Sequence, residues 1–132
     1  MSGTVVDKNL EHAWSQARCQ VESIQEMVKG LDSKKDNVRE EAEQTIREDA
    51  LSVEVRTDWH EPGTEGVNSE FCILLCTGGP AVRLIGELDQ WKQPDSVQMQ
   101  CQDWGTPWTE YPLDAEEEAA CLQYSQQFYF GE

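Results

Sequence analysis

Few residues in this sequence have the types and spacing that chemistry requires. The two histidines are His12 and His60, and His60 lies in the run Asp58-Trp59-His60-Glu61, which could supply an acid–base pair or a metal site. The spacing matches no zinc-protease, deaminase or EF-hand pattern, and no phosphate-binding loop or GxSxG motif occurs. We therefore expect no catalytic residue, no bound metal and no cofactor. A small enzyme that works through Asp58, His60 and Glu61 is an alternative hypothesis.

The cysteines also fail to form a chemical cluster. There are five of them, an odd number, and no two are spaced as CxxC. Disulfide frameworks and zinc sites are usually built from such paired spacings, so free buried thiols are expected instead. Cys72 and Cys76 are four residues apart in an apolar run, which predicts that they share one face of a strand.

Charge is the strongest feature of the sequence. The 132 residues carry 26 acidic and 10 basic side chains, for a formal net charge of −16. Residues 1–35 hold five charges of each sign, so the whole excess lies from Asp36 onward. Nucleic acid and anionic membranes would repel such a chain, which argues against direct binding to either. The excess equals the charge of roughly eight base pairs of duplex DNA.

The acidic residues between positions 36 and 66 are the candidate binding face. They lie away from the apolar positions of an expected helix and on the polar side of the strand after it. Trp91 joins them because a tryptophan in an exposed turn can anchor a protein partner. The candidate partner-binding residues are Glu40, Glu43, Glu48, Glu54, Asp58, Glu61, Glu65 and Trp91. A merely solubilising acidic surface is the alternative interpretation.

Periodicity predicts which elements position these residues. An apolar stripe with heptad-like spacing from Leu10 to Leu31 predicts one helix, and a second stripe from Val38 to Ala50 predicts another. The short link between them makes the two helices antiparallel neighbours. A coiled coil that self-associates along the first stripe is the alternative.

A sheet and a last helix are expected in the rest of the chain. Four apolar or alternating stretches predict strands, and their short links favour an antiparallel meander. These stretches are Val53–Trp59, Phe71–Cys76, Val82–Leu88 and Val97–Gln102. A final helix from Ala115 to Phe128 is expected to be capped by Asp114. Its positions Ala115, Ala119 and Leu122, with Tyr129 after its end, are expected to face the sheet.

The expected fold is therefore one α+β domain over residues 1–132. It consists of an N-terminal helical hairpin (1–51), a four-stranded antiparallel meander (52–104), and an aromatic loop followed by a C-terminal helix packed on the sheet (105–132). The N-terminus does not have the pattern of a signal peptide, and no apolar run is long enough to cross a membrane. A cytoplasmic location is expected.

Two C-terminal segments carry a resemblance. Residues 103–113, DWGTPWTEYPL, and residues 126–132, QQFYFGE, resemble uncharacterised phage and prophage proteins. In size, acidity and lack of an active site, the chain is similar to anti-CRISPR proteins and phage DNA mimics. The resemblance implies a non-enzymatic inhibitor that blocks the basic nucleic-acid-binding surface of a host defence complex, with a CRISPR–Cas effector as the leading target. A monomer or homodimer is expected. The alternative function is that of a phage structural or assembly protein that acts by self-association.

Overall fold

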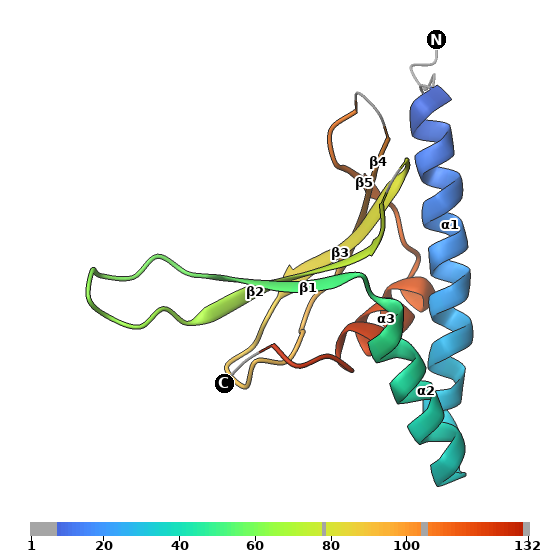
Figure 1. Ribbon diagram of the computed structural model, residues 1–132, viewed down its shortest axis with the longest axis horizontal. Coiled ribbons are helices and arrows are strands. Elements are labelled where there is room, and N and C mark those ends of the chain that lie inside the picture. Colours follow the sequence, from blue (N-terminus) through green and yellow to red (C-terminus); the bar gives the residue numbers. More distant parts are fainter. Residues whose placement is uncertain (1–7, 78, 104–105, 131–132) are drawn as a thin grey trace.

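The chain folds as a single antiparallel sheet with helices on one face (Figure 1). The computed structural model describes residues 8–77, 79–103 and 106–130. The elements in chain order are α1 (Lys8–Lys29), the short 3₁₀ helix η1 (Gly30–Asp32), α2 (Asp36–Asp49), β1 (Ser52–Thr57), β2 (Asn68–Cys76), β3 (Ala81–Glu87), β4 (Gln98–Gln102), β5 (Thr109–Tyr111) and α3 (Ala115–Ser125). Among these described residues, no helix has the length and apolar content needed to cross a membrane.

Helix α1 uses the predicted stripe to bury itself against its own chain. Ala17, Val21 and Ile24 are almost fully buried, and the helix packs across β3, β4 and α3. The apolar seam that a coiled coil would need is therefore covered within the chain. Gly30 follows the helix directly, and a Cβ atom there would lie 2.7 Å from the Cβ of Ala42. Glycine thus permits the close approach that joins α1 to α2.

Helix α2 is attached to the rest of the protein by few contacts. Ile46 is its one buried residue among the described side chains, with no exposed surface. Near its end, the hydroxyl of Tyr124 in α3 donates a hydrogen bond of 2.8 Å to Asp49. The expected helical hairpin is confirmed, and the burial of Ile46 and the hydrogen bond from Tyr124 to Asp49 are two of the contacts that hold α2 in position.

The sheet is a five-stranded meander in the order β1-β2-β3-β4-β5, one strand more than the sequence predicted. The additional strand, β5, pairs with β4 through Met99–Tyr111 and Cys101–Thr109. It lies within the segment that was expected to be an aromatic loop. Three residues are too few to show an alternating pattern, which explains the error. The α+β class and the meander are confirmed.

Cys72 and Cys76 lie on opposite faces of the sheet because strand β2 is irregular. The register of β2 against β3 shifts between Leu74 and Cys76. As a result, Cys72 lies near Arg83 on the face away from the helices, whereas Cys76 approaches α1 and the side chain of Gln16. The prediction that the two thiols share a face is wrong, because one residue of bulge reverses the direction of every later side chain.

The last helix begins as expected and buries a different face. Asp114 accepts a hydrogen bond from the backbone N–H of Glu117, and the Glu117 side chain accepts one from the backbone N–H of Asp114, which makes a complete capping box.

The face that α3 buries differs from the expected one. The buried residues are Ala120, Cys121, Tyr124 and Ser125. The expected inner positions Ala115 and Ala119 are exposed and Leu122 is only partly buried. Tyr129 is exposed because α3 already ends at Ser125. Tyr124 determines the orientation, since its large ring fills the space beside Asp49.

Burial of Cys121 predicts a loss of stability in alkaline solution. Desolvation, assisted by Glu117 and Glu118, raises the pKa of its thiol from 9.0 to about 12. Above pH 9 the thiol ionises in the unfolded chain while it stays protonated in the folded protein, so unfolding is favoured as pH rises. The free energy of unfolding should fall by about 1 kcal/mol per pH unit from this group alone, up to about pH 12.

Urea unfolding under reducing conditions at a series of pH values measures that slope. A Cys121→Ala variant removes the thiol and should have a shallower dependence above pH 9. The buried Tyr124 hydroxyl, whose pKa is also raised by desolvation, adds to the slope above about pH 10 in both proteins. Identical slopes for the wild type and the variant would contradict the role given to Cys121.

Candidate protein-binding surface

The β1–β2 hairpin projects from the body of the molecule as an acidic arm, defined here as residues 52–70 (Figure 1). The arm holds five carboxylates, Glu54, Asp58, Glu61, Glu65 and Glu70, and one guanidinium, Arg56. Every residue from Val53 to Val67 is exposed. The helices do not extend over this part of the sheet, so the arm is available to a partner from both sides.

The loop at the tip of the arm has its own internal hydrogen bonds. The backbone N–H of Asp58 donates to the carbonyl of Val67 at 3.2 Å, which carries the strand pairing past the end of β1. A turn is closed by the N–H of Thr64, which donates to the carbonyl of Glu61 at 3.1 Å. Gly63 has a φ of +84°, a conformation that favours glycine. The loop carboxylates are therefore presented on an ordered turn.

His60 takes part in this turn. Its Nδ1 atom lies 3.2 Å from the hydroxyl oxygen of Thr64, and a Cβ atom placed on Gly66 would lie 2.9 Å from its Nε2 atom. The ring therefore packs over Gly66 and shapes the loop. Within residues 8–77, 79–103 and 106–130, no three His, Cys, Asp or Glu side chains come together as metal ligands.

The structure separates the predicted site into two groups. Asp58, Glu61 and Glu65 belong to the loop of the acidic arm, which lies at one end of the long axis of the molecule, and Glu54 is on β1, nearer the body. Glu40, Glu43 and Glu48 lie on α2, near the other end (Figure 1). A single face running from α2 to the hairpin, as the sequence suggested, does not form because α2 packs beside the other helices.

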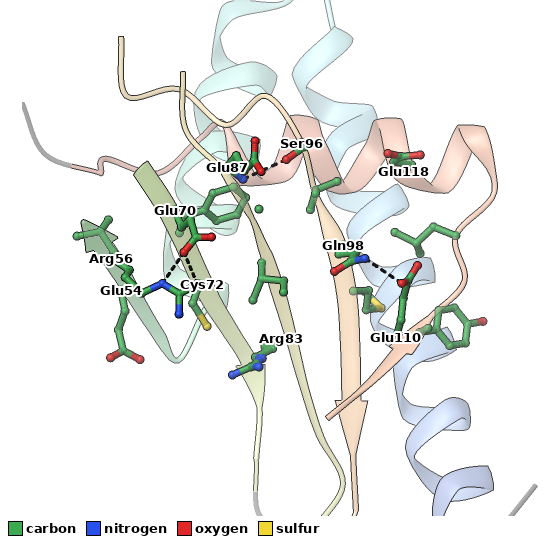
Figure 2. Close-up of a pocket in the computed structure, with 18 residues that line it drawn as sticks. Glu54, Arg56, Glu70, Cys72, Arg83, Glu87, Ser96, Gln98, Glu110 and Glu118 are labelled. Carbon is green, nitrogen blue, oxygen red and sulfur yellow. Dashed lines mark hydrogen bonds and ion pairs between the residues drawn. The ribbon is translucent and has the colours of Figure 1, made fainter. Parts of the chain in front are cut away.

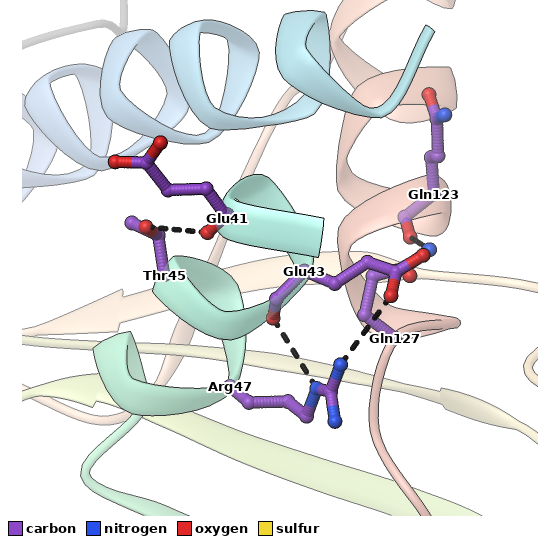
Figure 3. Close-up of polar contacts among 6 residues, drawn as sticks. All are labelled: Glu41, Glu43, Thr45, Arg47, Gln123 and Gln127. Carbon is purple, nitrogen blue, oxygen red and sulfur yellow. Dashed lines mark hydrogen bonds and ion pairs between the residues drawn. The ribbon is translucent and has the colours of Figure 1, made fainter. Parts of the chain in front are cut away.

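Two of the three candidate carboxylates on α2, those of Glu43 and Glu48, have partners on their own helix. The Arg47 guanidinium lies 3.4 Å from the Glu43 carboxylate and also donates to the Glu43 carbonyl (Figure 3). Glu48 accepts a hydrogen bond of 3.0 Å from Gln44.

Trp91 is separate from both the arm residues and the α2 residues. It is 72% exposed in the turn between β3 and β4, where Asp89 accepts from its backbone N–H.

A pocket of about 850 Å³ lies over the sheet next to the arm (Figure 2). Figure 2 shows Glu54 and Glu70 on the strands of the arm and Glu110 on β5, with side chains of the sheet between them. The carboxylates that line the pocket are those of Glu54, Glu70, Glu87, Glu110 and Glu118. Two of these belong to the arm, so the pocket and the arm form one continuous surface.

The two cations of this pocket already have partners. Arg56 forms an ion pair with Glu70 on the neighbouring strand. Arg83 donates to Gln100 at 2.8 Å, and its guanidinium lies 4.1 Å from the centre of the Trp108 ring. The remaining carboxylates are therefore the groups that can receive a cationic partner.

Cys72, the cysteine that lines the pocket, is not an activated nucleophile. Desolvation raises the pKa of the Cys72 thiol, although Arg83 acts in the opposite direction. A thiol with a raised pKa stays protonated near neutral pH and reacts slowly. The chemistry that this surface can perform is recognition of positive charge.

Sequence reasoning missed three acidic residues of the pocket that come from the sheet. Glu70 and Glu87 lie directly opposite each other on β2 and β3, and Glu110 pairs with Gln100 across β4 and β5. Glu87 is a polar position of an expected strand, whereas Glu70 and Glu110 lie outside the strands that the sequence predicted. Only the pairing register brings them together.

Comparison with known proteins identified no similar protein. No protein-family model, no curated protein and no solved structure matches the chain.

Proposed function

We propose that the protein is a non-enzymatic inhibitor that binds the basic, nucleic-acid-binding surface of a host defence complex, most directly a CRISPR–Cas effector. The observation that supports this most strongly is the acidic arm. It places five carboxylates against one guanidinium on an exposed projection, in a chain whose net charge is −16. The chemically complementary surface is one rich in Lys and Arg.

The mode of action follows from charge and shape. Long-range attraction steers an acidic protein toward a basic groove and speeds association. The narrow arm then enters the groove, where its carboxylates take the place of phosphate groups. The neighbouring pocket carboxylates extend the contact, and Trp91, exposed in the turn between β3 and β4, supplies a separate aromatic anchor. Nucleic acid is excluded because its binding residues are occupied.

Charge reversal of the loop tests this proposal. The variant with Asp58→Lys, Glu61→Lys and Glu65→Lys should bind its target at least roughly thirtyfold more weakly, since each exposed carboxylate contributes part of the attraction. The measurement is displacement of a labelled DNA target from a panel of purified CRISPR–Cas effectors, followed by fluorescence anisotropy. Inhibition by the wild type should also weaken steeply as salt rises.

A matched control separates specific recognition from net charge. The variant with Glu40→Lys, Glu43→Lys and Glu48→Lys changes the total charge by the same amount on α2. It should inhibit within about threefold of the wild type, because rim charges outside an interface have small effects. Equal losses in both variants would indicate a non-specific effect, and a loss in the α2 variant alone would move the site away from the arm. If no effector in the panel releases its DNA, the proposed target class is wrong.

A further inference from the structure

Strand β1 leaves one edge of the sheet open. It is the first strand in the order β1-β2-β3-β4-β5, so its outer side faces no other strand in the part of the chain that the structure describes. The described part of the chain has seven exposed large hydrophobic side chains, and four of them lie in the nine-residue segment 51–59, which contains this edge strand. These four are Leu51, Val53, Val55 and Trp59.

The strand carries the charged residues Glu54 and Arg56 but no residue that interrupts its backbone. Its sequence, SVEVRT, contains no proline, glycine or lysine. The irregularity near its end, where Arg56 opposes Glu70 and Thr57 opposes Asn68, inserts the extra residue Ser69 into β2. The backbone of β1 is therefore regular, and a second strand can hydrogen-bond along it.

The side chains of β1 are complementary to those of a second β1 in one antiparallel register. When Val55 opposes Val55 of the second copy, Glu54 opposes Arg56, and the symmetric pair repeats this contact. On the other side of the strand, Val53 then opposes Thr57 and Leu51 opposes Trp59. The register thus matches unlike charges on one face and covers the four exposed apolar side chains on the other.

Neighbouring symmetric registers are unfavourable. Moving the axis to residue 54 places Glu54 opposite its own copy, and moving it to residue 56 places Arg56 opposite its own copy. The second of these also brings Glu54 opposite Asp58. Like charges directly opposite each other destabilise a strand pair, so the register centred on Val55 is selected.

We propose that two copies of this chain join edge to edge through β1, with the two-fold axis at Val55, to form one continuous ten-stranded sheet. Each Arg56 then lies between Glu70 of its own chain, with which it already pairs, and Glu54 of the other copy. The interface is isologous and closes on itself, so it produces a dimer and not a filament. Glu61 and Glu65 lie beyond the paired segment, whereas Glu54 and Asp58 of the acidic arm lie within it. The dimer is inferred from the edge of β1 alone and does not rest on the proposed function.

Complementary charge variants test the dimer and its register together. Sedimentation of the wild type over rising concentration should show the mass increase from 15.0 kDa to twice that value. The variant Glu54→Arg places arginines opposite each other, and Arg56→Glu places glutamates opposite each other. Each alone should raise the dimer dissociation constant at least roughly tenfold. A mixture of the two variants restores both unlike pairs and should recover dimers.

Recovery in the mixture also excludes misfolding as the cause of the single-variant results. The control Glu61→Arg makes the same charge change outside the paired segment and should dimerise as the wild type does. The proposal is overturned if the wild type remains a monomer at every concentration, if Glu54→Arg dimerises as tightly as the wild type, or if the mixed variants associate no better than each one alone.

Discussion

Replacing Gly86 with alanine is expected to lower the free energy of unfolding by at least about 3 kcal/mol, because the new methyl group has no space. An ideal Cβ atom on Gly86 would lie 1.9 Å from the carbonyl oxygen of Ser96 and 2.7 Å from Cε1 of Phe71. Both values are far below van der Waals contact, and the nearest atom belongs to the backbone. The strand connection at Ser96 would have to move, and the pairing of β3 with β4 would be disturbed. Equilibrium urea unfolding measures the loss.

Gly63→Ala is the matched control for this substitution. No atom lies within 4 Å of the added methyl group at Gly63, but its φ of +84° is unfavourable for alanine. The cost should be about 1 kcal/mol, the ordinary penalty for a non-glycine residue in that conformation. If Gly86→Ala proves no more destabilising than Gly63→Ala, then the close approach of Ser96 does not constrain the sheet.

Truncation of Ile46 to alanine should detach helix α2. Ile46 is fully buried and is the helix's one buried residue in the described structure. Removing a buried isoleucine side chain to alanine costs about 2–5 kcal/mol when the surroundings cannot collapse, and we expect about 3 kcal/mol here. Since few other contacts retain α2, the loss should appear as local opening. Amide hydrogen exchange should accelerate in residues 36–49 by about two orders of magnitude, while β2 and β3 stay protected.

Val38→Ala provides the comparison on the same helix. Val38 is only partly buried, so its truncation should cost less than about 1 kcal/mol and leave the exchange of α2 nearly unchanged. Uniform acceleration across the whole protein in Ile46→Ala would contradict local detachment, because it would show that α2 unfolds only together with the sheet.

The predictions from sequence succeeded where the determining interactions are local. The stripe through Val21 and Ile24 repeats with the period of a helix, and both side chains are buried. The capping box at Asp114 is likewise a short-range pattern. The meander followed from short links between strands. In each case, residues close together in the chain carry the information.

The errors arise where strands or layers meet. Val53 and Val55 alternate as a half-buried strand should, yet they are exposed because no helix extends over β1. The position of Cys76 depends on a shift in pairing with β3. The candidate site divided for the same reason: Glu43 and Glu61 are near in sequence, but the packing of α2 carries them to different ends. Alternation within one segment contains no information about such contacts.

The projection of the acidic arm beyond the helices has an evolutionary consequence. Asp58, Glu61 and Glu65 are exposed, so substitutions there cost little folding stability. Core positions such as Ile24 and Leu84 have no such freedom. Natural variants should therefore diverge fastest in the loop at the tip, while the sheet and α1 that support it change slowly.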